Sequence, residues 1–320
     1  MPLLFAILLV LLFVAIIVTY KFIAITRVKI PEAPHKIITG IKNVNSSDAH
    51  AIPRIIWSYW HELPLPNFVT LCHNNWQQHA PDHEIRILNK NTIGEWISAD
   101  KIPDYFYALP PYRQADWLRL QLLATYGGIW VDASIIMTRN LNWLHEIQQQ
   151  ENSEYVGFYI NLYTNRPDKP IIENWFMAAT MGSCFIRDLA LEFNRAIQLG
   201  ESVYLKEIIE KGKFTDIIQL IAPAKMQQYL IMHVAASVLL DKDNGRYRLA
   251  LFRAEDTAFV FHSLLHWSKR TLHFKLTLTP CPKKLPFFIK LRGGERERAE
   301  RYLAKGWYYR GSLLAKFLKL

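Results

Sequence analysis

The stretch that decides the fold is PYRQADWLRLQLLATYGGIWVDASIIM, residues 111–137. Its first half carries apolar residues at helical spacing after a proline suited to a first helical turn, and two glycines then end the helix. Ile129, Trp130 and Val131 read as a short buried strand that ends on Asp132. An acid at the carboxyl end of a strand in an α/β sheet lies where such sheets usually bind ligands. The stretch therefore predicts a helix, a turn and a strand that presents an acid to a ligand.

The same residues allow a purely structural interpretation. Asp132 can cap the turn that follows it, and Asp116 with Arg119, three positions apart, can form a solvated helical ion pair worth roughly 0.3 kcal/mol. Spacing alone does not exclude this alternative. The types of residue around the stretch are needed to decide between the two.

Strand and helix patterns alternate outside this stretch, which predicts an α/β domain over residues 53–270. Strands are expected at residues 55–60, 84–88, 155–160 and 258–261, and helices at 67–79, 171–181, 185–197 and 223–240. The chain has neither a Gly-x-Gly-x-x-Gly fingerprint nor a phosphate loop with Gly-Lys-Ser/Thr. A nicotinamide enzyme or an ATPase would have to lack its usual signature.

The N-terminal residues predict a membrane anchor. Residues 2–20 carry no charge, and eighteen such residues in a helix reach about 27 Å, close to the hydrocarbon thickness of a bilayer. A cleavable signal peptide is the alternative, but no Lys or Arg precedes the apolar run and no small-x-small site follows it directly. Lys21, Arg27 and Lys29 follow the span, which places the rest of the chain in the cytoplasm. We expect an uncleaved anchor over residues 1–29.

Residues 30–52 show little periodicity and read as a linker that contains a formal glycosylation acceptor, Asn45-Ser46-Ser47. The cytoplasmic orientation argues against modification there. Cys72, Cys184 and Cys281 are odd in number and widely spaced, which suits a reducing compartment and structural roles.

The residues from Asp116 to Ser134 resemble the sugar-binding signature of the DXD-containing glycosyltransferases of family 32, in which a helical Asp-x-x-Arg precedes a Tyr-Gly-Gly turn and a strand-end Asp. The resemblance is closest to the capsular polysaccharide synthesis branch, where Ala and a hydroxyl residue follow the acid. The strand IPRIIWSYW, residues 52–60, is similar to the first strand of that family. The resemblance implies a Rossmann-like, GT-A type domain that binds a nucleotide sugar.

The resemblance also implies roles for particular residues. Asp116, Arg119 and Asp132 would be catalytic, the first two bound to the sugar and the third to the ribose or a metal. Trp60 would lie against the nucleotide base, where stacking is worth roughly 1 to 3 kcal/mol. The residues expected to bind the nucleotide sugar are Tyr59, Trp60, Arg113 and Asn174, although an Asn in a helical Glu-Asn pair is more often only solvated.

A divalent cation, Mn²⁺ or Mg²⁺, would be held by Asp132, Ser134 and His262, with His266 as the second choice of histidine. Ser134 stands where the family usually has a second carboxylate, and a neutral hydroxyl is a poorer ligand for either ion. A histidine beside apolar residues is also commonly structural. Metal dependence is therefore a hypothesis.

The C-terminal residues are strongly basic. From residue 268 to residue 320 there are 14 Lys or Arg and 3 Glu, whereas the rest of the chain is close to neutral because the whole carries a net charge of +10. Aromatic and aliphatic residues are interleaved with these cations. Residues 271–320 read as a basic amphipathic helical tail that binds an anionic membrane surface, and a solvated basic face is the alternative.

Together these features predict a membrane-anchored glycosyltransferase of the bacterial inner membrane. It would move a hexosyl group from a nucleotide sugar, most simply a UDP-sugar, to a hydroxyl of a capsular or cell-surface polysaccharide with retention at the sugar carbon. The partners expected are the nucleotide sugar, the glycan acceptor and membrane lipids. One rival is a noncatalytic, membrane-bound glycan-binding or scaffold protein that keeps the fold. A nucleic-acid-binding protein is the second rival, but the basic segment has no zinc, RNP or helix-turn-helix signature.

Overall fold

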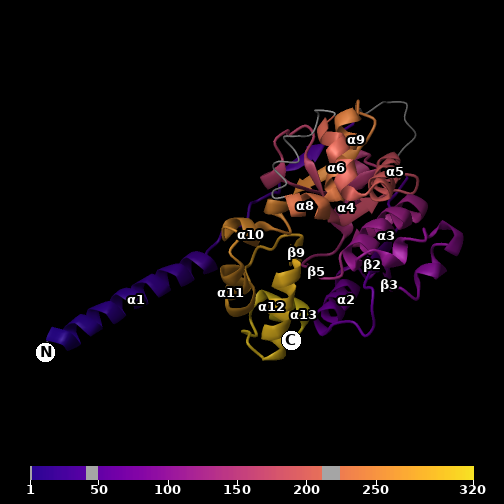
Figure 1. Cartoon of the computed structure of the whole chain (residues 1–320). Helices are drawn as coiled ribbons and strands as arrows, with labels where there is room; N and C mark the ends of the chain where they lie inside the picture. Colours follow the sequence, from indigo (N-terminus) through magenta and orange to yellow (C-terminus); the bar gives the residue numbers. More distant parts are fainter. Residues whose placement is uncertain (1, 41–49, 211–223) are drawn as a thin grey trace.

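The computed structural model of the chain describes residues 2–40, 50–210 and 224–320, and Figure 1 shows their arrangement. The strands are β1 (Lys36–Ile38), β2 (Ile55–Tyr59), β3 (Glu84–Leu88), β4 (Gly128–Val131), β5 (Ile135–Met137), β6 (Tyr155–Ile160), β7 (Ile171–Ala179), β8 (Leu249–Arg253) and β9 (Phe288–Lys290). The α-helices are α1 (Pro2–Thr26), α2 (Asn67–His79), α3 (Pro111–Tyr126), α4 (Asn142–Glu151), α5 (Cys184–Leu199), α6 (Glu201–Glu210), α8 (Ala224–Tyr229), α9 (Ile231–Lys242), α10 (Val260–Leu264), α11 (Lys269–Leu278), α12 (Gly293–Ala304) and α13 (Leu313–Leu318). Short 3-10 helices lie at Ile93–Glu95, Ala99–Lys101, Phe106–Ala108, Asn161–Tyr163 and Ala254–Asp256.

Seven strands form one mixed sheet in the order β1-β8-β6-β7-β4-β2-β3. β2 pairs in parallel with β3 and β4, and β6 pairs in parallel with β8, whereas β7 runs antiparallel to both of its neighbours. The predicted α/β fold is confirmed, but the sheet is not wholly parallel. A short connection over residues 161–170 joins β6 to β7 without a long crossover helix, which suits antiparallel pairing.

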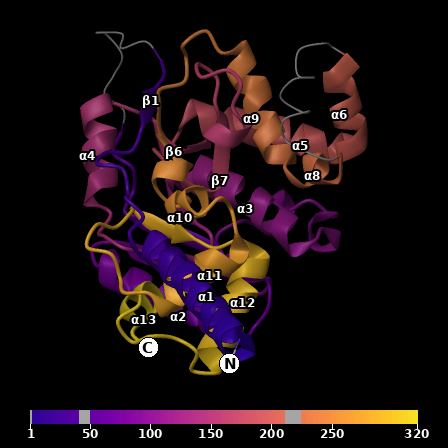
Figure 2. The ribbon, with the colours of Figure 1, turned by 90° about the vertical axis from the view of Figure 1, so that its left-hand side faces the viewer.

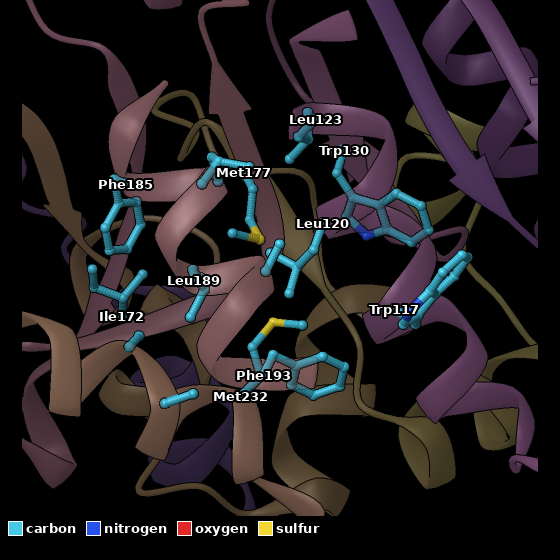
Figure 3. Packing of buried hydrophobic residues seen from close by; sticks show 14 of the residues in the cluster. Trp117, Leu120, Leu123, Trp130, Ile172, Met177, Phe185, Leu189, Phe193 and Met232 are labelled. Carbon is cyan, nitrogen blue, oxygen red and sulfur yellow. The ribbon is translucent and has the colours of Figure 1, made fainter. Parts of the chain in front are cut away.

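Alternating residues along the strands supply two separate layers of core. Trp57 and Trp130 face the layer formed with α3, α5 and α9, while Ile56 and Ile129 face the layer formed with α2 and α4. Figure 3 shows part of the first layer, in which Trp117, Phe185 and Phe193 come from helices and Met177 comes from β7. Helices therefore cover both faces of the sheet, and its inner strands β4 and β6 are buried on both sides.

The turn between α3 and β4 needs its two glycines. Gly127 ends the helix with a φ of +64°, and Gly128 follows with a φ of +95°. A Cβ on Gly128 would lie 2.5 Å from Ile55 Cγ2 and 2.8 Å from the carbonyl oxygen of Ile55. Both the backbone angle and the neighbouring strand thus exclude a side chain here, and the expected helix, turn and strand of residues 111–137 are confirmed.

Two boundaries expected from the sequence are wrong. Residues 30–52 are not only a linker, because β1 forms an edge strand of the sheet and pairs with β8. Residues 271–320 are not a tail: β9 pairs with β5, and Leu272, Leu276, Leu313 and Leu314 are buried in a third apolar cluster that also contains Phe68 of α2. The expected glycosylation acceptor at 45–47 lies outside the described residues.

Two expected elements also have the other type of secondary structure. Residues 171–179 form the strand β7 and not the expected helix. The strand expected at residues 258–261 is also absent there: residues 260–264 form helix α10, and the nearest strand, β8, ends at Arg253. Both segments are short, mainly apolar and largely buried. Periodicity cannot distinguish a buried strand from a buried helix in such runs.

The helix α1 extends away from the body of the fold in Figure 1, and its described side chains from Leu4 onward are largely exposed. It is long and apolar enough to cross a membrane, by length and composition, and a signal sequence near an N-terminus has the same properties. Its last turns touch α11, where the rings of Phe22 and Phe274 pack edge to face with their centres 5.9 Å apart. In Figure 2 the side from which α1 extends faces the reader, and α1 passes in front of α11 and α12.

Gly128→Ala is expected to destabilise the fold by at least about 2 kcal/mol, because it adds a close contact with the backbone of β2 to an unfavourable φ. The matched control is Gly94→Ala, where nothing lies within 4 Å of the added Cβ and the change should be nearly neutral. Thermal unfolding of the detergent-solubilised chain measures both. Equal melting temperatures for the two variants would contradict this account of the turn.

Candidate functional site

A pocket of about 670 Å³ opens at the carboxyl ends of β2 and β4. These strands pair in parallel, with Trp57 opposite Trp130, so the residues that follow them lie side by side. Tyr59 and Trp60 come from β2 and its end, and Asp132 follows β4. The other walls come from α3, the β7 strand, α8, α9 and the start of α12. This is the place where α/β sheets commonly bind ligands.

Asp116 of α3 lies in the wall of the pocket with a 5 % exposed surface. Arg113 donates to its Oδ2 at 2.8 Å, and the side-chain amide of Asn174 donates to its Oδ1 at 3.1 Å. Arg119 contacts the same Oδ1 at 3.5 Å. Burial raises the pKa of Asp116 above its ordinary value, while Arg119 and Arg113 oppose that rise. The two arginines therefore reduce the effect of burial on the pKa of Asp116 but do not cancel it.

Asp132 is held between two cations. Arg119 Nη2 lies 3.2 Å from its Oδ1, which also accepts the indole N–H of Trp130 at 3.0 Å, and Lys290 Nζ lies 2.6 Å from its Oδ2. Burial raises the pKa of Asp132, but Lys290 and Arg119 together outweigh it and hold the pKa below its ordinary value. Asp132 is accordingly an anion at neutral pH.

Arg119 joins the two acids into one network. Besides both carboxylates, its guanidinium donates to the carbonyl oxygen of Asn174 and lies 4.9 Å from the centre of the Trp130 ring. Its side chain is only 5 % exposed. Because so many partners fix this guanidinium, it provides a rigid positive charge between Asp116 and Asp132.

An irregularity in β7 brings two neighbouring side chains into the pocket. The pairing of β6 and β7 shifts between Gly157 and Phe158, so that Gly157 faces Met177 while Phe158 faces Glu173. The intervening residues, which include Asn174, are left unpaired with β6. In a regular strand Glu173 and Asn174 would point to opposite faces, but both line the pocket here. Bulges of this kind often re-aim side chains beside active sites.

Most of the residues expected in the site do line this pocket: Tyr59, Trp60, Asp116, Arg119, Asp132, Ser134 and Asn174. Arg113 is not in the lining; it lies behind Asp116 and is 1 % exposed, with Glu201 at 2.6 Å as a second acidic partner. His262 is not in the lining either. Its side chain is 1 % exposed, and its Nε2 lies 2.9 Å from Glu295 Oε2.

The donor set does not fit a divalent cation at Asp132. Mg²⁺ and Mn²⁺ require several oxygen ligands, but both carboxylate oxygens of Asp132 already accept hydrogen bonds from nitrogen donors. His262, which was expected to complete the metal site, is paired with Glu295 and lies outside the pocket lining. Within residues 2–40, 50–210 and 224–320, no group of three or more His, Cys, Asp or Glu side chains could hold a metal ion.

The sequence interpretation missed the cations that the C-terminal residues bring to the pocket. Lys290, Arg292 and Arg296 all line it, and Arg296 lies 4.9 Å from the ring centre of Trp60. The basic composition of residues 268–320 was visible in the sequence, but it was assigned to a membrane surface. Nothing in the local pattern indicated that β9 returns to pair with β5 beside Asp132.

Residues 25–198, which are 174 of the 320 residues, match the sequence model of a family described as capsular polysaccharide synthesis protein. The chain belongs to this family. The match includes Asp116, Asp132 and Asn174, and it ends before the C-terminal cations.

Two fungal glycosyltransferases resemble part of the chain. O-glycosyltransferase braB of Annulohypoxylon truncatum is 27 % identical over 150 residues, which cover 41 % of the chain and 35 % of the relative. Glycosyltransferase afumC of Aspergillus fumigatus is 26 % identical over 164 residues, which cover 46 % of the chain and 40 % of the relative. The chain thus spans well under half the length of either relative. These names support glycosyl transfer at the level of the family.

Solved structures of glycosyltransferases are similar only at low scores. The PaToxG glycosyltransferase has a TM-score of 0.32 and 13 % identity over 90 % of the chain and 91 % of that structure. A glycosyltransferase involved in the glycosylation of the major capsid of PBCV-1 has a TM-score of 0.39 and 10 % identity over 78 % of the chain and 98 % of that structure. Because these TM-scores are low, the description of the fold rests on the sheet of this chain and not on these similarities.

The pairing of Glu295 with His262 and Arg292 can be tested through the pH dependence of stability. Burial raises its pKa, but hydrogen bonds from His262 and Arg292 lower it to about 2, against an ordinary value of 4.5. Because the folded value is the lower one, the carboxylate stabilises the fold fully above about pH 4.5, and this contribution is lost as the pH falls towards about 2. The full contribution is on the order of 3 kcal/mol.

We therefore expect wild type to be more stable than Glu295→Gln at neutral pH, with a difference that shrinks steadily below about pH 4.5. Urea unfolding of both proteins over this range measures the difference directly. Glu297→Gln, in which the replaced side chain is exposed, is the control. A difference between wild type and Glu295→Gln that stays constant down to about pH 3 would refute the assigned pairing.

Proposed function

We propose that this chain is a glycosyltransferase that uses a nucleotide sugar, most simply a UDP-sugar, and acts on a hydroxyl of a capsular or cell-surface polysaccharide. The observation that carries the proposal is the network in which Arg119 bridges Asp116 and Asp132 at the wall of a 670 Å³ pocket. Membership of the capsular polysaccharide synthesis family and the names of the two fungal relatives support the same class of reaction. The resemblance of residues 116–134 to the signature of glycosyltransferase family 32 supports it further.

The acidic groups suit the recognition of a sugar. Sugar hydroxyls donate hydrogen bonds, and charged acceptors make the stronger bonds of this kind. Asp116 is buried in the wall of the pocket beside two arginines, and Asn174 adds a polar side chain from the bulged part of β7. Aromatic rings from Trp60, Trp175 and Trp267 also line the pocket and can pack on the base or on the apolar faces of sugar rings.

The proposed reaction exchanges one bond at the sugar carbon for another. The bond from that carbon to the diphosphate oxygen breaks, and its electron pair stays with the diphosphate. An acceptor hydroxyl oxygen forms the new bond, and with retention it approaches from the face that the diphosphate leaves, so that the diphosphate can take its proton. Positive charge develops on the sugar and negative charge on the leaving group. Asp132 and Asp116 are near enough to Arg119 for this site to stabilise both signs of charge.

The proposed activity is tested by release of the nucleotide from a panel of nucleotide sugars, with the full chain in detergent micelles. Asp116→Asn and Asp132→Asn are each expected to lower kcat/KM by about a hundredfold or more, because each removes a charge that acts on the reacting groups. Asp100→Asn, on an exposed 3-10 helix, should leave kcat/KM unchanged.

The noncatalytic alternative makes a different prediction for the same assay. A scaffold that only keeps the fold would release no nucleotide from any donor, and Asp132→Asn would not change its affinity for a glycan. That pair of results would exclude the proposed enzyme. Turnover that Asp116→Asn and Asp132→Asn leave intact would show that the reaction occurs elsewhere on the chain.

We also propose that α1 anchors the chain in a bacterial inner membrane and that the C-terminal part contacts lipid headgroups from the cytoplasmic side. A second cavity of about 360 Å³ is lined by Arg270, Arg298, Arg301, Tyr302, Lys305 and Trp307. Arg270 lies one helical turn before Phe274, the residue that touches the end of α1. Cations and a tryptophan beside the end of an apolar helix suit anionic phospholipid headgroups.

A chain that begins at residue 30 should bind vesicles that contain phosphatidylserine and release them as the salt concentration rises. Replacing both Arg298 and Arg301 with Ala should weaken this binding about tenfold or more, because each cation near an anionic surface contributes about 1 kcal/mol. The control replaces Lys283 and Lys284, which are exposed and lie outside the cavity. Vesicle binding that the double arginine variant retains in full would end the headgroup proposal.

A further inference from the structure

Departure of a nucleoside diphosphate requires positive charge beside its phosphates. The donors around Asp132 do not fit a divalent cation, as shown above, so the charge must have another source in this site. The structure assigns that role to Lys290 and Arg296: we propose that these two side chains bind the diphosphate of the donor in place of a metal ion. The inference rests on the proposed use of a nucleotide sugar.

Lys290 is positioned by backbone pairing and not by a flexible loop. It stands opposite Ile135 in the two-stranded β5–β9 sheet, and its backbone N–H donates to the carbonyl oxygen of Ala258 at 3.3 Å. The ammonium has three N–H donors, of which Asp132 accepts one at 2.6 Å. The side chain is 11 % exposed and lines the pocket, so the remaining donors are available to an anion bound there.

Arg296 has unused hydrogen-bonding capacity. Its Nε is buried without a hydrogen-bond partner among the described residues, and its contact with the exposed Glu297 is long, at 3.9 Å. The side chain as a whole is 23 % exposed and lines the pocket, so its guanidinium can donate to a phosphate oxygen bound there. The guanidinium lies 4.9 Å from the ring centre of Trp60, the residue expected against the nucleotide base. A base on Trp60 would therefore place its phosphates beside Arg296.

The start of α12 leaves room for a phosphate at the same point. Gly293 lines the pocket and begins this helix, whose first N–H groups have no partner within the helix. A Cβ on Gly293 would meet nothing within 4 Å, and one on Gly294 would meet only Lys269 Nζ at 3.9 Å. Packing within the described chain therefore does not require these glycines. The open space lets an anion approach the helix N-terminus, which adds to the charge of the two side chains.

His262 and Glu295 explain how this end of the pocket is kept in place. Glu295 accepts from His262 Nε2 at 2.9 Å and from the Nε of Arg292 at 2.9 Å, and it also accepts the backbone N–H of Arg292. His262 is therefore a positioning residue in this proposal and not a metal ligand. It fixes the first turn of α12, from which Arg296 reaches the pocket.

The experiment measures the affinity of the full chain in detergent micelles for nucleoside diphosphates, beginning with UDP, and for the parent nucleosides. Titration calorimetry is done with EDTA and again with Mn²⁺. The variants are Lys290→Ala, Lys290→Arg and Arg296→Ala. The matched controls are Lys284→Ala and Arg310→Ala, which remove exposed cations of the same C-terminal region outside the pocket.

We expect the wild-type affinity for UDP to agree within about twofold in EDTA and in Mn²⁺. Lys290→Ala and Arg296→Ala should each weaken UDP binding at least about tenfold, which is about 1.4 kcal/mol, because each removes a charge from the phosphates. Their affinities for uridine should change by less than about threefold, since uridine has no phosphate. Lys290→Arg should recover most of the UDP affinity. If Lys290 were needed only for folding, its loss would weaken the binding of UDP and of uridine alike.

Two results would overturn the proposal. One is wild-type UDP binding that EDTA abolishes and Mn²⁺ restores, and the other is UDP binding that Lys290→Ala and Arg296→Ala both leave unchanged. Thermal unfolding identifies a variant that fails to fold, and in that case the remaining variant decides. A wild-type chain that binds no nucleoside diphosphate would instead overturn the proposed function itself, together with this inference.

Discussion

The ion pairs of Asp132 with Arg119 and Lys290 hold the site together. Asp132 and Arg119 come from the end of β4 and from the preceding helix α3, whereas Lys290 comes from β9, far away in the sequence. A carboxylate that is partly removed from water is costly unless it is paired, and Asp132, which is 26 % exposed, has a cation at each oxygen. The C-terminal residues therefore complete an electrostatic arrangement that the central motif begins. Their apolar cluster with α2 holds them in the place where this pairing is possible.

The network has an asymmetry that suits two different parts of a substrate. On the side of Asp116, three polar side chains converge on one carboxylate: Arg113, Arg119 and Asn174 all contact it. On the side of Trp60, the cations have donors to spare, and the start of α12 is open. The first arrangement suits directional recognition of neutral hydroxyl groups. The second suits an anion that brings its own acceptors.

The sequence predicted those parts of the fold that depend on local chemistry. The helix, glycine turn and strand of residues 111–137 follow from helical spacing and from the positive φ of Gly127 and Gly128. The β7 strand was mistaken for a helix because residues 171–179 are buried on both faces and have no alternation. The approach of Lys290 to Asp132 depends on the pairing of β9 with β5, a contact between segments about 150 residues apart that no local pattern encodes.

The proposed charge neutralisation and the proposed sugar recognition place different geometric demands on the side chains that would carry them. A hydrogen bond to a hydroxyl weakens steeply with misalignment, so its acceptors must sit at fixed positions on one rigid unit, here α3 and the end of β4. Coulomb attraction falls only as the inverse of distance and has no preferred angle. Any segment that folds back to within a few ångströms of the phosphates can supply it. Residues 25–198 contain the groups proposed for the first role, and a later segment, β9 with α12, contains those proposed for the second.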